Sequence, residues 1–543
     1  MKRVPMTSYE AARAAFAWEI PESFNFGGDV VDAWARARPD QLALVWSDEA
    51  GRERRFTHAG MRAASNRMAN ALVAAGIGKG DRVVVMLPRI PEWPIAMVGC
   101  LKVGAVPIPC IDMLTARDIA YRLENAGARG AITTAANVDK FAAGGQLVAR
   151  FALGGGAGWQ ELDAALAAAP EDFAPVRVGA EEPAIMYYTS GSTGHPKGVL
   201  HASRALFAWR VSAWYWLDLD ADDTVWCTAD TGWSKAGTSI LFGPWSCGAR
   251  VLLHDGRFDA RRRFELLARH RVTVFCAAAT ELRRLVREDP GGFDLGALRL
   301  TVSAGESVNP GIVRRWTALT GGPLLDGYGQ TETLMTVLNY RAMPVKPGSM
   351  GRALPGTEVA VVGPDGARAP AGQTGRLVVR LPNPQVMLGY WREPERTEAA
   401  RIGLEGGAWF VTGDLASMDE EGYVFYQGRA DDVINSAGYR IGPMEVENVL
   451  MEHPAVAECA VVGSPDAERG EVVKAFVVLA PGHAPDDALV KDLQDHAKRQ
   501  TGPYKYPRRV AFVDDLPKTA SGKIRRNLLR EKEFSGKSTD RSG

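Results

Sequence analysis

Hydroxyl, glycine and lysine residues are concentrated in one short segment, Thr189-Ser190-Gly191-Ser192-Thr193-Gly194-His195-Pro196-Lys197-Gly198. The segment follows an apolar strand pattern and leads into a helical pattern that begins near Ser203. Hydroxyls, N–H groups exposed beside glycines and a lysine cation can together bind phosphate groups. A P-loop is excluded, because Pro196 stands where that motif requires the glycine that precedes Lys-Ser/Thr. A Ser/Gly surface loop without a ligand is the alternative that composition alone leaves open.

The full string from Tyr188 to Val199 resembles the signature of the adenylate-forming superfamily. This superfamily includes acyl-CoA synthetases, firefly-luciferase-like enzymes and nonribosomal peptide synthetase adenylation domains. Further segments resemble its later motifs and follow in the family's order, at residues 303–307, 326–333, 409–414, 428–432, 436–442 and 516–524. The resemblance extends from about residue 40 to about residue 530. It implies an AMP-forming acyl-CoA synthetase that uses ATP and Mg²⁺ to activate a carboxylic acid.

The resemblance implies a nucleotide site assembled from most of these segments. Tyr328 is expected to stack on adenine with its flat ring, and Glu332 to bind Mg²⁺ as a hard oxygen ligand. Asp414 is expected to accept hydrogen bonds from both ribose hydroxyls, since a carboxylate has acceptors for two donors at once. The implied nucleotide-binding residues are Thr189, Ser190, Gly191, Ser192, Thr193, Gly194, Lys197, Gly305, Glu306, Ser307, Asp326, Gly327, Tyr328, Gln330, Thr331, Asp414, Arg429, Arg440 and Lys523.

Lys523, Glu332 and Thr189 are the implied catalytic residues. By the family pattern, a moving small domain delivers the Lys523 cation, which neutralises charge while the carboxylate attacks the α-phosphate. Asp431 would be the hinge of that movement, and an interdomain ion pair is the alternative interpretation of the Arg429–Asp431 segment. The small domain would also line the tunnel for the pantetheine arm of coenzyme A, with Ala437, Gly438 and Tyr439.

Five residues form the implied acyl pocket: Trp233, Ser234, Lys235, Ala304 and Gly329. The run from Asp230 to Gly237 looks most like the medium-chain acyl-CoA synthetase branch, with benzoate-CoA ligases as close neighbours. Acetyl-CoA synthetases have tryptophan where this chain has Gly329, so room for an acid longer than two carbons is implied. Lys235 does not suit a plain fatty acid, because a buried cation needs a partner. Either it extends outward to water, or the acid has a polar or acidic far end.

Coenzyme A is the expected acceptor, because no carrier-protein module follows Lys523. The expected reaction forms an acyl-adenylate and pyrophosphate, and then an acyl-CoA thioester and AMP. The acid is expected to be medium-chain, branched or aromatic. The alternatives are transfer to a carrier protein, an oxidative fate of the adenylate, and a noncatalytic nucleotide-binding protein. The joint presence of Asp414, Arg429 and Lys523 favours catalysis.

Composition restricts the partners and the compartment. The 64 Lys+Arg and 64 Asp+Glu residues cancel, which argues against nucleic acid as a partner. Six scattered cysteines form no CxxC pair and indicate buried thiols in a reducing compartment. The first residues contain no apolar signal region, and the apolar stretch 90–111 contains Glu92 and Lys102. We therefore expect a cytoplasmic enzyme without stable membrane insertion. A homodimer, and a lysine acetylase acting on Lys523, are open hypotheses.

Hydrophobic periodicity predicts the elements that must position these residues. Helices over 57–75 and 92–103 alternate with strands over 82–87 and 105–110. A second series of strands is predicted at 184–188, 224–228, 250–254, 272–276 and 298–303. Such alternation is typical of βαβ units with parallel sheets. Between 345 and 428, Gly/Pro turns flank short β-branched runs and predict a β-rich subdomain.

The chain of 543 residues exceeds what one hydrophobic core usually supports. We expect an α/β fold with a large, two-layered N-terminal domain over 1–428, which includes the β-rich subdomain near 345–428. A hinge at 429–432 and a small mobile α+β domain over 433–533 follow, with a disordered tail at 534–543. Within the small domain, helices are predicted from about 443 and over 487–499, and strands over 456–462, 474–479 and 509–513.

Overall fold

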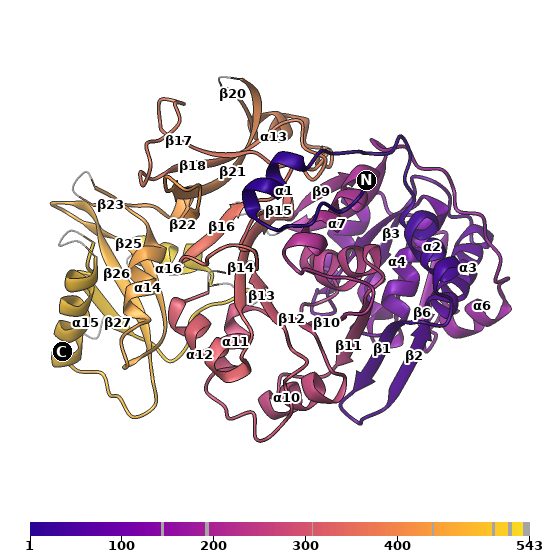
Figure 1. The fold of residues 1–543 in the computed structure, drawn as a ribbon, viewed down its shortest axis with the longest axis horizontal. Coiled ribbons are helices and arrows are strands. Elements are labelled where there is room, and N and C mark those ends of the chain that lie inside the picture. Colours follow the sequence, from indigo (N-terminus) through magenta and orange to yellow (C-terminus); the bar gives the residue numbers. More distant parts are fainter. Residues whose placement is uncertain are drawn as a thin grey trace.

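The computed structural model describes residues 1–142, 146–189, 195–306, 308–404, 406–436, 439–501, 505–519 and 524–535. The expected α/β fold with a β-rich part and a small C-terminal α+β unit is confirmed. Figure 1 shows the first α/β layer (indigo to purple) and the C-terminal sheet (yellow) at opposite ends of the molecule. The large sheet and the β-rich part lie between them, so residues distant in sequence can meet there.

The first layer is a parallel sheet of order β4-β3-β5-β6-β7. Its strands are β3 (Arg82–Val85), β4 (Val106–Pro109), β5 (Gly130–Thr134), β6 (Ala149–Leu153) and β7 (Gln160–Glu161). The associated helices are α3 (His58–Ala74), α4 (Glu92–Val103), α5 (Ala116–Ala126), the 3₁₀ turn η2 (Ala135–Phe141) and α6 (Leu162–Ala168). The predicted alternation holds here because each β-branched run between helices pairs in parallel with its neighbour.

A second parallel series forms one half of the largest sheet, in the order β14-β13-β12-β10-β11-β1. Its strands are β1 (Leu42–Asp48), β10 (Thr224–Cys227), β11 (Arg250–Asp255), β12 (Val274–Cys276), β13 (Leu300–Ala304) and β14 (Leu324–Gln330), with β2 (Glu53–Thr57) antiparallel at the edge. The associated helices are α7 (Ser203–Tyr215), α8 (Ser234–Ala236), the π-helix η3 (Gly237–Leu241), α9 (Phe242–Ser246), α10 (Ala260–Arg269), α11 (Ala279–Leu285) and α12 (Pro310–Thr320). The loops after parallel strands gather at one edge, where ligands of α/β proteins bind.

The strand predicted at 184–188 does not belong to this second series, and that assignment is corrected. It is β8 (Pro183–Thr189), which pairs antiparallel with β9 (Lys197–Ala202), while β19 (Gly389–Tyr390) pairs with the other side of β9. The phosphate segment therefore connects two strands, and β9 separates it from helix α7. Strand β9 was not predicted, because its six residues include Lys197, Gly198 and His201 and show no regular hydrophobic alternation.

The predicted β-rich region is confirmed, and its strands continue the large sheet through β15 and β16. It contains β15 (Leu334–Leu338), β16 (Ser349–Ala353), β17 (Val359–Val362), β18 (Gly375–Arg380), β20 (Arg401–Leu404), β21 (Gly407–Met418) and β22 (Val424–Arg429), with α13 (Pro394–Ala399). All of these strands pair antiparallel. The backbone hydrogen bonds therefore connect the motif at 326–333 directly to the β-rich region.

The C-terminal unit is a separate sheet of order β24-β23-β26-β25, with β27 beside β26. It follows the 3₁₀ turn η4 (Ala430–Asp432) and contains β23 (Ile434–Ser436), β24 (Tyr439–Ile441), β25 (Val456–Asp466), β26 (Gly470–Leu479), β27 (Arg509–Phe512), α14 (Pro443–Leu450), α15 (Asp487–Gln500) and α16 (Arg526–Phe534). Helix α16 was not predicted. It is held by a buried ion pair between Lys474 and Glu533, with 2.9 Å between Nζ and Oε1. Beyond residue 535, the expected tail lies outside the described residues.

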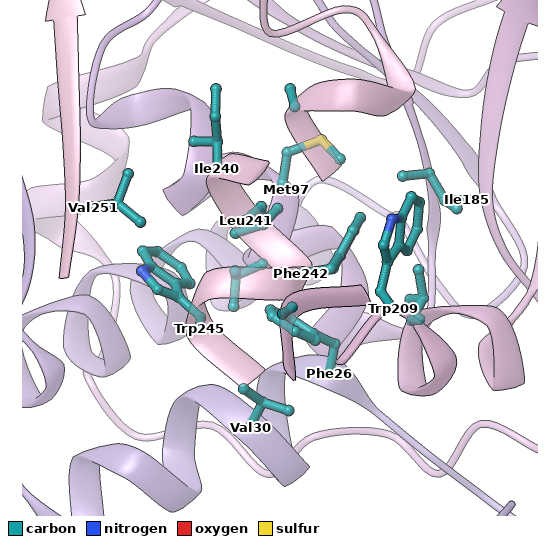
Figure 2. Close-up of a cluster of buried hydrophobic side chains, with 14 of the residues drawn as sticks. Phe26, Val30, Met97, Ile185, Trp209, Ile240, Leu241, Phe242, Trp245 and Val251 are labelled. Carbon is teal, nitrogen blue, oxygen red and sulfur yellow. The ribbon is translucent and has the colours of Figure 1, made fainter. Parts of the chain in front are cut away.

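The largest hydrophobic core joins the N-terminal segment to the helices of the second layer (Figure 2). The N-terminal segment contains α1 (Tyr9–Ala15), the π-helix η1 (Gly27–Val31) and α2 (Asp32–Ala37). Phe242 packs edge-on against Phe26, with 4.9 Å between ring centroids, and stacks on Trp209 at 4.7 Å. Ile240, Leu241 and Trp245 surround this contact. The chain from η3 into α9 is thereby fixed, and with it the short helix α8 that precedes it.

All six cysteines are buried and free of disulfides, as their apolar surroundings predicted. Among the described residues, no helix has the length and apolar character needed to cross a bilayer.

Candidate active site

Asp414 is the centre of a buried hydrogen-bond cluster at the junction of the large sheet and the β-rich region. Its Oδ2 accepts hydrogen bonds from the Tyr328 hydroxyl at 2.5 Å and the Gln330 amide at 2.6 Å. Its Oδ1 accepts one from the Tyr426 hydroxyl at 3.4 Å and faces Arg429 Nη1 at 3.7 Å. Burial, followed by the charge of Asp414, raises the pKa of Tyr328 well above its usual value. Tyr328 therefore stays a neutral donor.

Strand register explains why these distant residues meet. Asp414 on β21 is the cross-strand partner of Arg429 on β22. The Gln330 amide also donates to the Thr412 carbonyl at 2.8 Å, which ties the end of β14 to β21. The motifs expected at 326–333, 409–414 and 428–432 therefore converge. Arg429 also lies 3.6 Å from Asp431, between Nη2 and Oδ2, which is a local contact within the expected hinge segment and not an ion pair between domains.

Glu332 belongs to a second cluster, which contains two neighbours of the phosphate segment. Its Oε1 accepts a hydrogen bond from the Tyr390 hydroxyl at 3.0 Å. Lys197 Nζ lies over the Tyr390 ring, 5.0 Å from its centroid. Thr189 is the cross-strand partner of Lys197. Burial, followed by Arg396, lowers the pKa of Lys197, although the charge of Glu332 opposes that effect. Lys197 on β9 and Glu332, in the turn after β14, therefore both contact Tyr390, and Thr189 on β8 is paired with Lys197.

The backbone beside Glu332 is held by a histidine. His201 on β9 is fully buried, and its Nε2 lies 2.6 Å from the Thr331 carbonyl oxygen. The carbonyl can only accept, so Nε2 carries the proton. Burial lowers the pKa of His201 to about 4, which leaves the ring neutral at physiological pH. The backbone N–H of Met387 donates to the Glu332 carbonyl at 2.8 Å, so both peptide groups of this turn are anchored.

The expected acyl-pocket residues approach the same turn from α8 and β13. The Ser234 hydroxyl lies 3.2 Å from the Thr331 hydroxyl. Lys235 Nζ donates to the Ala304 carbonyl at the end of β13, at 3.2 Å. Trp233 is the N-cap of α8 and is partly buried. The segment from Trp233 to Lys235 therefore lies between the Glu332 turn and the loop after β13.

Gly329 has a structural reason that sequence reasoning did not consider. A Cβ at this position would lie 2.0 Å from the Leu334 carbonyl oxygen, at an irregular pairing between β14 and β15. No real Cβ can approach a carbonyl oxygen so closely. The glycine is therefore required by the backbone, whatever the length of the acyl pocket.

The loop after β13 contains the remaining expected nucleotide residues. Gly305 has φ +92°, which glycine adopts without strain, and a Cβ added there would meet no described atom within 4 Å. Glu306 Oε2 faces Arg283 Nη2 at 3.6 Å, and Arg283 Nη1 lies 3.9 Å from Glu458 Oε1 of the C-terminal unit. Asp326 accepts N–H groups of Gly327 and Val308, and burial raises its pKa to about 7.

Several expected site residues fall outside the described structure: Ser190, Gly191, Ser192, Thr193, Gly194, Ser307, Ala437, Gly438, Lys523 and the side chain of Arg440. Tyr439, expected to line the coenzyme A tunnel, is 54% exposed on β24. Tyr390 and His201, by contrast, were missed by sequence reasoning although they contact the expected site. His201 lies three residues beyond Gly198, within the same β hairpin, which was the available signal. Tyr390 had none, because only folding brings it to Glu332.

The fold and the two carboxylate clusters define the class of adenylate-forming enzymes. Residues 31–391 match the model of the AMP-binding enzyme family, and residues 445–523 match that of the AMP-binding enzyme C-terminal domain. The chain belongs to the AMP-binding enzyme family. It is an ATP-dependent carboxylic acid:CoA ligase that forms an acyl-adenylate and then an acyl-CoA, and its reaction uses ATP, Mg²⁺ and coenzyme A.

Curated relatives include acyl-coenzyme A synthetase ACSM3, mitochondrial, of Mus musculus, which is 41% identical over 97% of this chain and 94% of its own length. The human protein ACSM5, mitochondrial, is 40% identical over 95% of this chain and 91% of its own. Among solved structures, the anthranilate CoA ligase AuaEII with anthranoyl-AMP has a TM-score of 0.86 at 29% identity, over 95% of this chain and 98% of that chain. A benzoate CoA ligase from Burkholderia xenovorans LB400 has a TM-score of 0.83 at 30% identity, over 94% of this chain and all of that one. The expected resemblance to medium-chain synthetases and benzoate-CoA ligases is confirmed.

The expected cytoplasmic location is wrong, because these curated relatives are named mitochondrial proteins. An apolar run at the N-terminus is the mark of a secretory signal only. Mitochondrial targeting segments are amphipathic and arginine-rich, so the lack of an apolar run does not distinguish the compartments.

Proposed function

We propose that the Asp414 cluster and the Glu332 cluster bind the two ends of one ATP molecule. The observation that carries this proposal is the single turn that joins them. Gln330 hydrogen-bonds to Asp414, and Glu332, two residues further, faces Tyr390 and Lys197. A ligand along this turn would meet a diol acceptor at one end and a cation-binding carboxylate at the other.

In this proposal Asp414 and Arg429 bind the ribose, and the loop after β13 borders the adenine, on which Tyr328 stacks. Thr189, the segment 190–194 and Lys197 bind the phosphates. Lys197 supports this role because, among the described residues, its ammonium forms no ion pair and lies over an aromatic ring.

Glu332 fits the Mg²⁺ ion that the family uses. Its Oε1 accepts the Tyr390 hydroxyl, while its Oε2 has no hydrogen-bond partner among the described residues. A partly exposed carboxylate with a free oxygen is the ligand that Mg²⁺ takes alongside phosphate oxygens and water. When bound, the ion neutralises charge on the phosphates. Tyr390 orients the carboxylate, and His201 holds the turn that carries it.

The first half-reaction joins the acid carboxylate to the α-phosphorus of ATP and releases pyrophosphate. We propose that Lys523 stabilises the charge that develops in this step. The small domain then rotates about Asp431, and Ala437, Gly438 and Tyr439 line the path of coenzyme A. Its thiol attacks the acyl carbonyl, and AMP leaves as the thioester forms. The separate C-terminal sheet, which begins directly after η4 (Ala430–Asp432), supports a junction at 429–432.

The acid that we propose is medium-chain, branched or aromatic. The solved neighbours support the aromatic part of this range, because they include ligases named for anthranilate and benzoate. A screen of pyrophosphate release over acids of graded length and branching, with and without coenzyme A, tests it. The expected result is release with at least one such acid and thioester formation only with coenzyme A. Activity confined to acetate would overturn the proposed substrate range.

Lys523→Ala tests the division between the half-reactions. Adenylation should fall by about 100-fold or more, since a positioned charge of this kind contributes that much to the rate. Thioester formation from preformed acyl-adenylate should change little. Equal loss in both assays would contradict the assignment of Lys523 to the first step.

A homodimer and acetylation of Lys523 are two further proposals, for which the family resemblance is the support. Light scattering of the purified protein tests the first. Mass spectrometry of Lys523 after incubation with a lysine acetylase and acetyl-CoA, followed by the adenylation assay, tests the second, since a neutral acetyl-lysine should lose the first half-reaction.

A further inference from the structure

Lys235 lies in a short helix that leads into a well-packed part of the core and that approaches the Glu332 turn. It is the central residue of α8, which leads directly into η3. The following residues Ile240 and Leu241 are packed in the largest core (Figure 2). The preceding residue, Ser234, contacts Thr331 of the Glu332 turn at 3.2 Å. The direction of the Lys235 side chain is therefore set by packing and not by a free surface loop.

The Lys235 ammonium group has hydrogen-bonding capacity left over. An ammonium has three N–H donors, and among the described residues Lys235 makes one hydrogen bond, to the Ala304 carbonyl at 3.2 Å. Ala304 is the last residue of β13, so Nζ of the partly buried Lys235 lies at the carboxyl end of that strand. Extension of the side chain outward to water, one of the two readings of this lysine, does not fit such a contact.

The acidic groups around Lys235 already have other partners. Glu281 is paired with Arg263, with 2.6 Å between Oε1 and Nε, and it also accepts the Thr228 hydroxyl. Glu306 faces Arg283 at 3.6 Å. Asp326 accepts two backbone N–H groups. Within the described residues, no carboxylate lies within 4.0 Å of Lys235 Nζ.

The immediate surroundings of Lys235 also include two buried thiols. Cys227 on β10 and Cys276 on β12 are cross-strand neighbours, and Cys276 Sγ contacts the Ser239 hydroxyl at 3.4 Å. Burial by itself lowers the pKa of Lys235, but the thiols and Glu306 outweigh it, so the ammonium stays charged. A charged group with unused donors, held at a substrate pocket, requires a complementary acceptor.

We propose that Lys235 selects carboxylic acids whose far end carries a second anionic or strongly hydrogen-bond-accepting oxygen, with a second carboxylate as the best match. The inference rests on the proposed acyl pocket and deepens it. In the bound state the unused N–H donors of Lys235 reach the distal oxygen. A plain alkyl end would instead leave the ammonium desolvated and unpaired. Lys235 is a specificity-determining residue and takes no part in bond formation.

Matched acids of equal carbon number test the proposal: hexanoate against adipate, and octanoate against suberate. Pyrophosphate release is measured for the wild type, Lys235→Met and Lys235→Gln. Lys491→Met, on the exposed face of α15, is the control for loss of a lysine. A dicarboxylate should exceed its monocarboxylate partner in kcat/KM with the wild type. Lys235→Met should reduce kcat/KM for the dicarboxylate by about 10- to 100-fold, as expected for a charged hydrogen bond.

The monocarboxylates should react equally well or better with Lys235→Met, and the KM for ATP should not change. With Lys235→Gln, kcat/KM for the dicarboxylate should lie between the values for the wild type and Lys235→Met, because glutamine keeps a hydrogen-bond donor but has no charge. A monocarboxylate preference in the wild type, or an unchanged ratio in both variants, overturns the inference. Failure of the underlying function is distinguishable, because neither the wild type nor Lys491→Met would then release pyrophosphate with any acid. Thermal melting of each variant shows whether a folding defect causes a change in the ratio of kcat/KM between dicarboxylate and monocarboxylate.

Discussion

Asp414 and Glu332 are two carboxylates of one candidate site with opposite surroundings. Asp414 is 4% exposed and accepts hydrogen bonds from Tyr328, Gln330 and Tyr426, with Arg429 nearby. Glu332 is only partly buried and accepts one hydrogen bond, from Tyr390, among the described residues. The carboxylate of Asp414 thus holds several side chains of the fold together, whereas the carboxylate of Glu332 is available to a ligand.

The surroundings of the two carboxylates explain why their roles differ. Asp414 sits where three strands meet, so removing its charge leaves several buried donors unpaired. Glu332 sits on a turn whose backbone is held by His201 and Met387, so its side chain can serve a ligand without cost to the fold. Stability and activity should therefore respond differently to mutation of the two residues.

Substitution of Glu332 should have the largest effect, and it should be on activity. Glu332→Gln keeps the shape of the side chain but removes the charge that Mg²⁺ requires. Pyrophosphate release should fall by about 100- to 1000-fold, with the free energy of unfolding changed by about 0.5 kcal/mol or less. Enzyme assays and urea denaturation measure the two quantities. A large loss of stability would mean that Glu332 is structural like Asp414, and the comparison would fail.

Substitution of Asp414 should instead have a large effect on the stability of the fold. Asp414→Ala leaves the Tyr328 hydroxyl, the Gln330 amide and Arg429 without their common acceptor. The free energy of unfolding should fall by about 3 kcal/mol, and the KM for ATP should rise as well. Urea denaturation with a spectroscopic probe checks the first effect. Wild-type stability in this variant would show that the Asp414 cluster does not stabilise the fold.

The pH dependence of stability should report on the histidine beneath the Glu332 turn. Burial lowers the pKa of His201 to about 4, so the unfolded chain binds a proton near pH 6.5 while the folded chain does not. The contribution of neutral His201 to the free energy of unfolding is therefore fully present above about pH 6.5 and is lost as the pH falls toward 4. His201→Gln should make the decrease between pH 7 and pH 5 shallower by about 2 kcal/mol. Denaturation curves at several pH values, compared between the two proteins, check this. Parallel curves would contradict a neutral buried imidazole.

The smallest effect is expected for substitution of Tyr390. This substitution tests whether the Tyr390 hydroxyl orients the Glu332 carboxylate for Mg²⁺. Tyr390→Phe removes the hydroxyl that donates to Glu332 and keeps the ring under Lys197. The Mg²⁺ concentration for half-maximal activity should rise about 5- to 10-fold, which corresponds to one hydrogen bond to a charged group. The transfer of a preformed acyl-adenylate to coenzyme A should not change. An unaltered Mg²⁺ dependence would show that Glu332 orients itself without Tyr390.

Particular elements show where sequence reasoning succeeded. The helix predicted over 92–103 is α4 (Glu92–Val103), and the strand predicted over 250–254 lies within β11 (Arg250–Asp255). Both have a clear hydrophobic pattern between clear boundary residues. The helix predicted near Ser203 is α7 (Ser203–Tyr215), but β9 was not predicted and β8 was assigned to the wrong sheet, because pairing direction leaves no trace in a short strand. Helix α16 was missed because the buried Lys474–Glu533 pair that holds it joins two charged residues 59 positions apart.

The class of chemistry could be predicted from the residues alone. The phosphate segment, Glu332, Asp414 and Lys523 occur in an order and with neighbours that match one family, and local residue identity is enough to establish this. Only the tertiary structure decided which groups touch: Tyr390 on Glu332, His201 on Thr331, four side chains around Asp414, and Lys235 on Ala304. The physical reason is that these contacts join strands and turns distant in the chain. Their geometry follows from register and packing, which no local pattern of residues records.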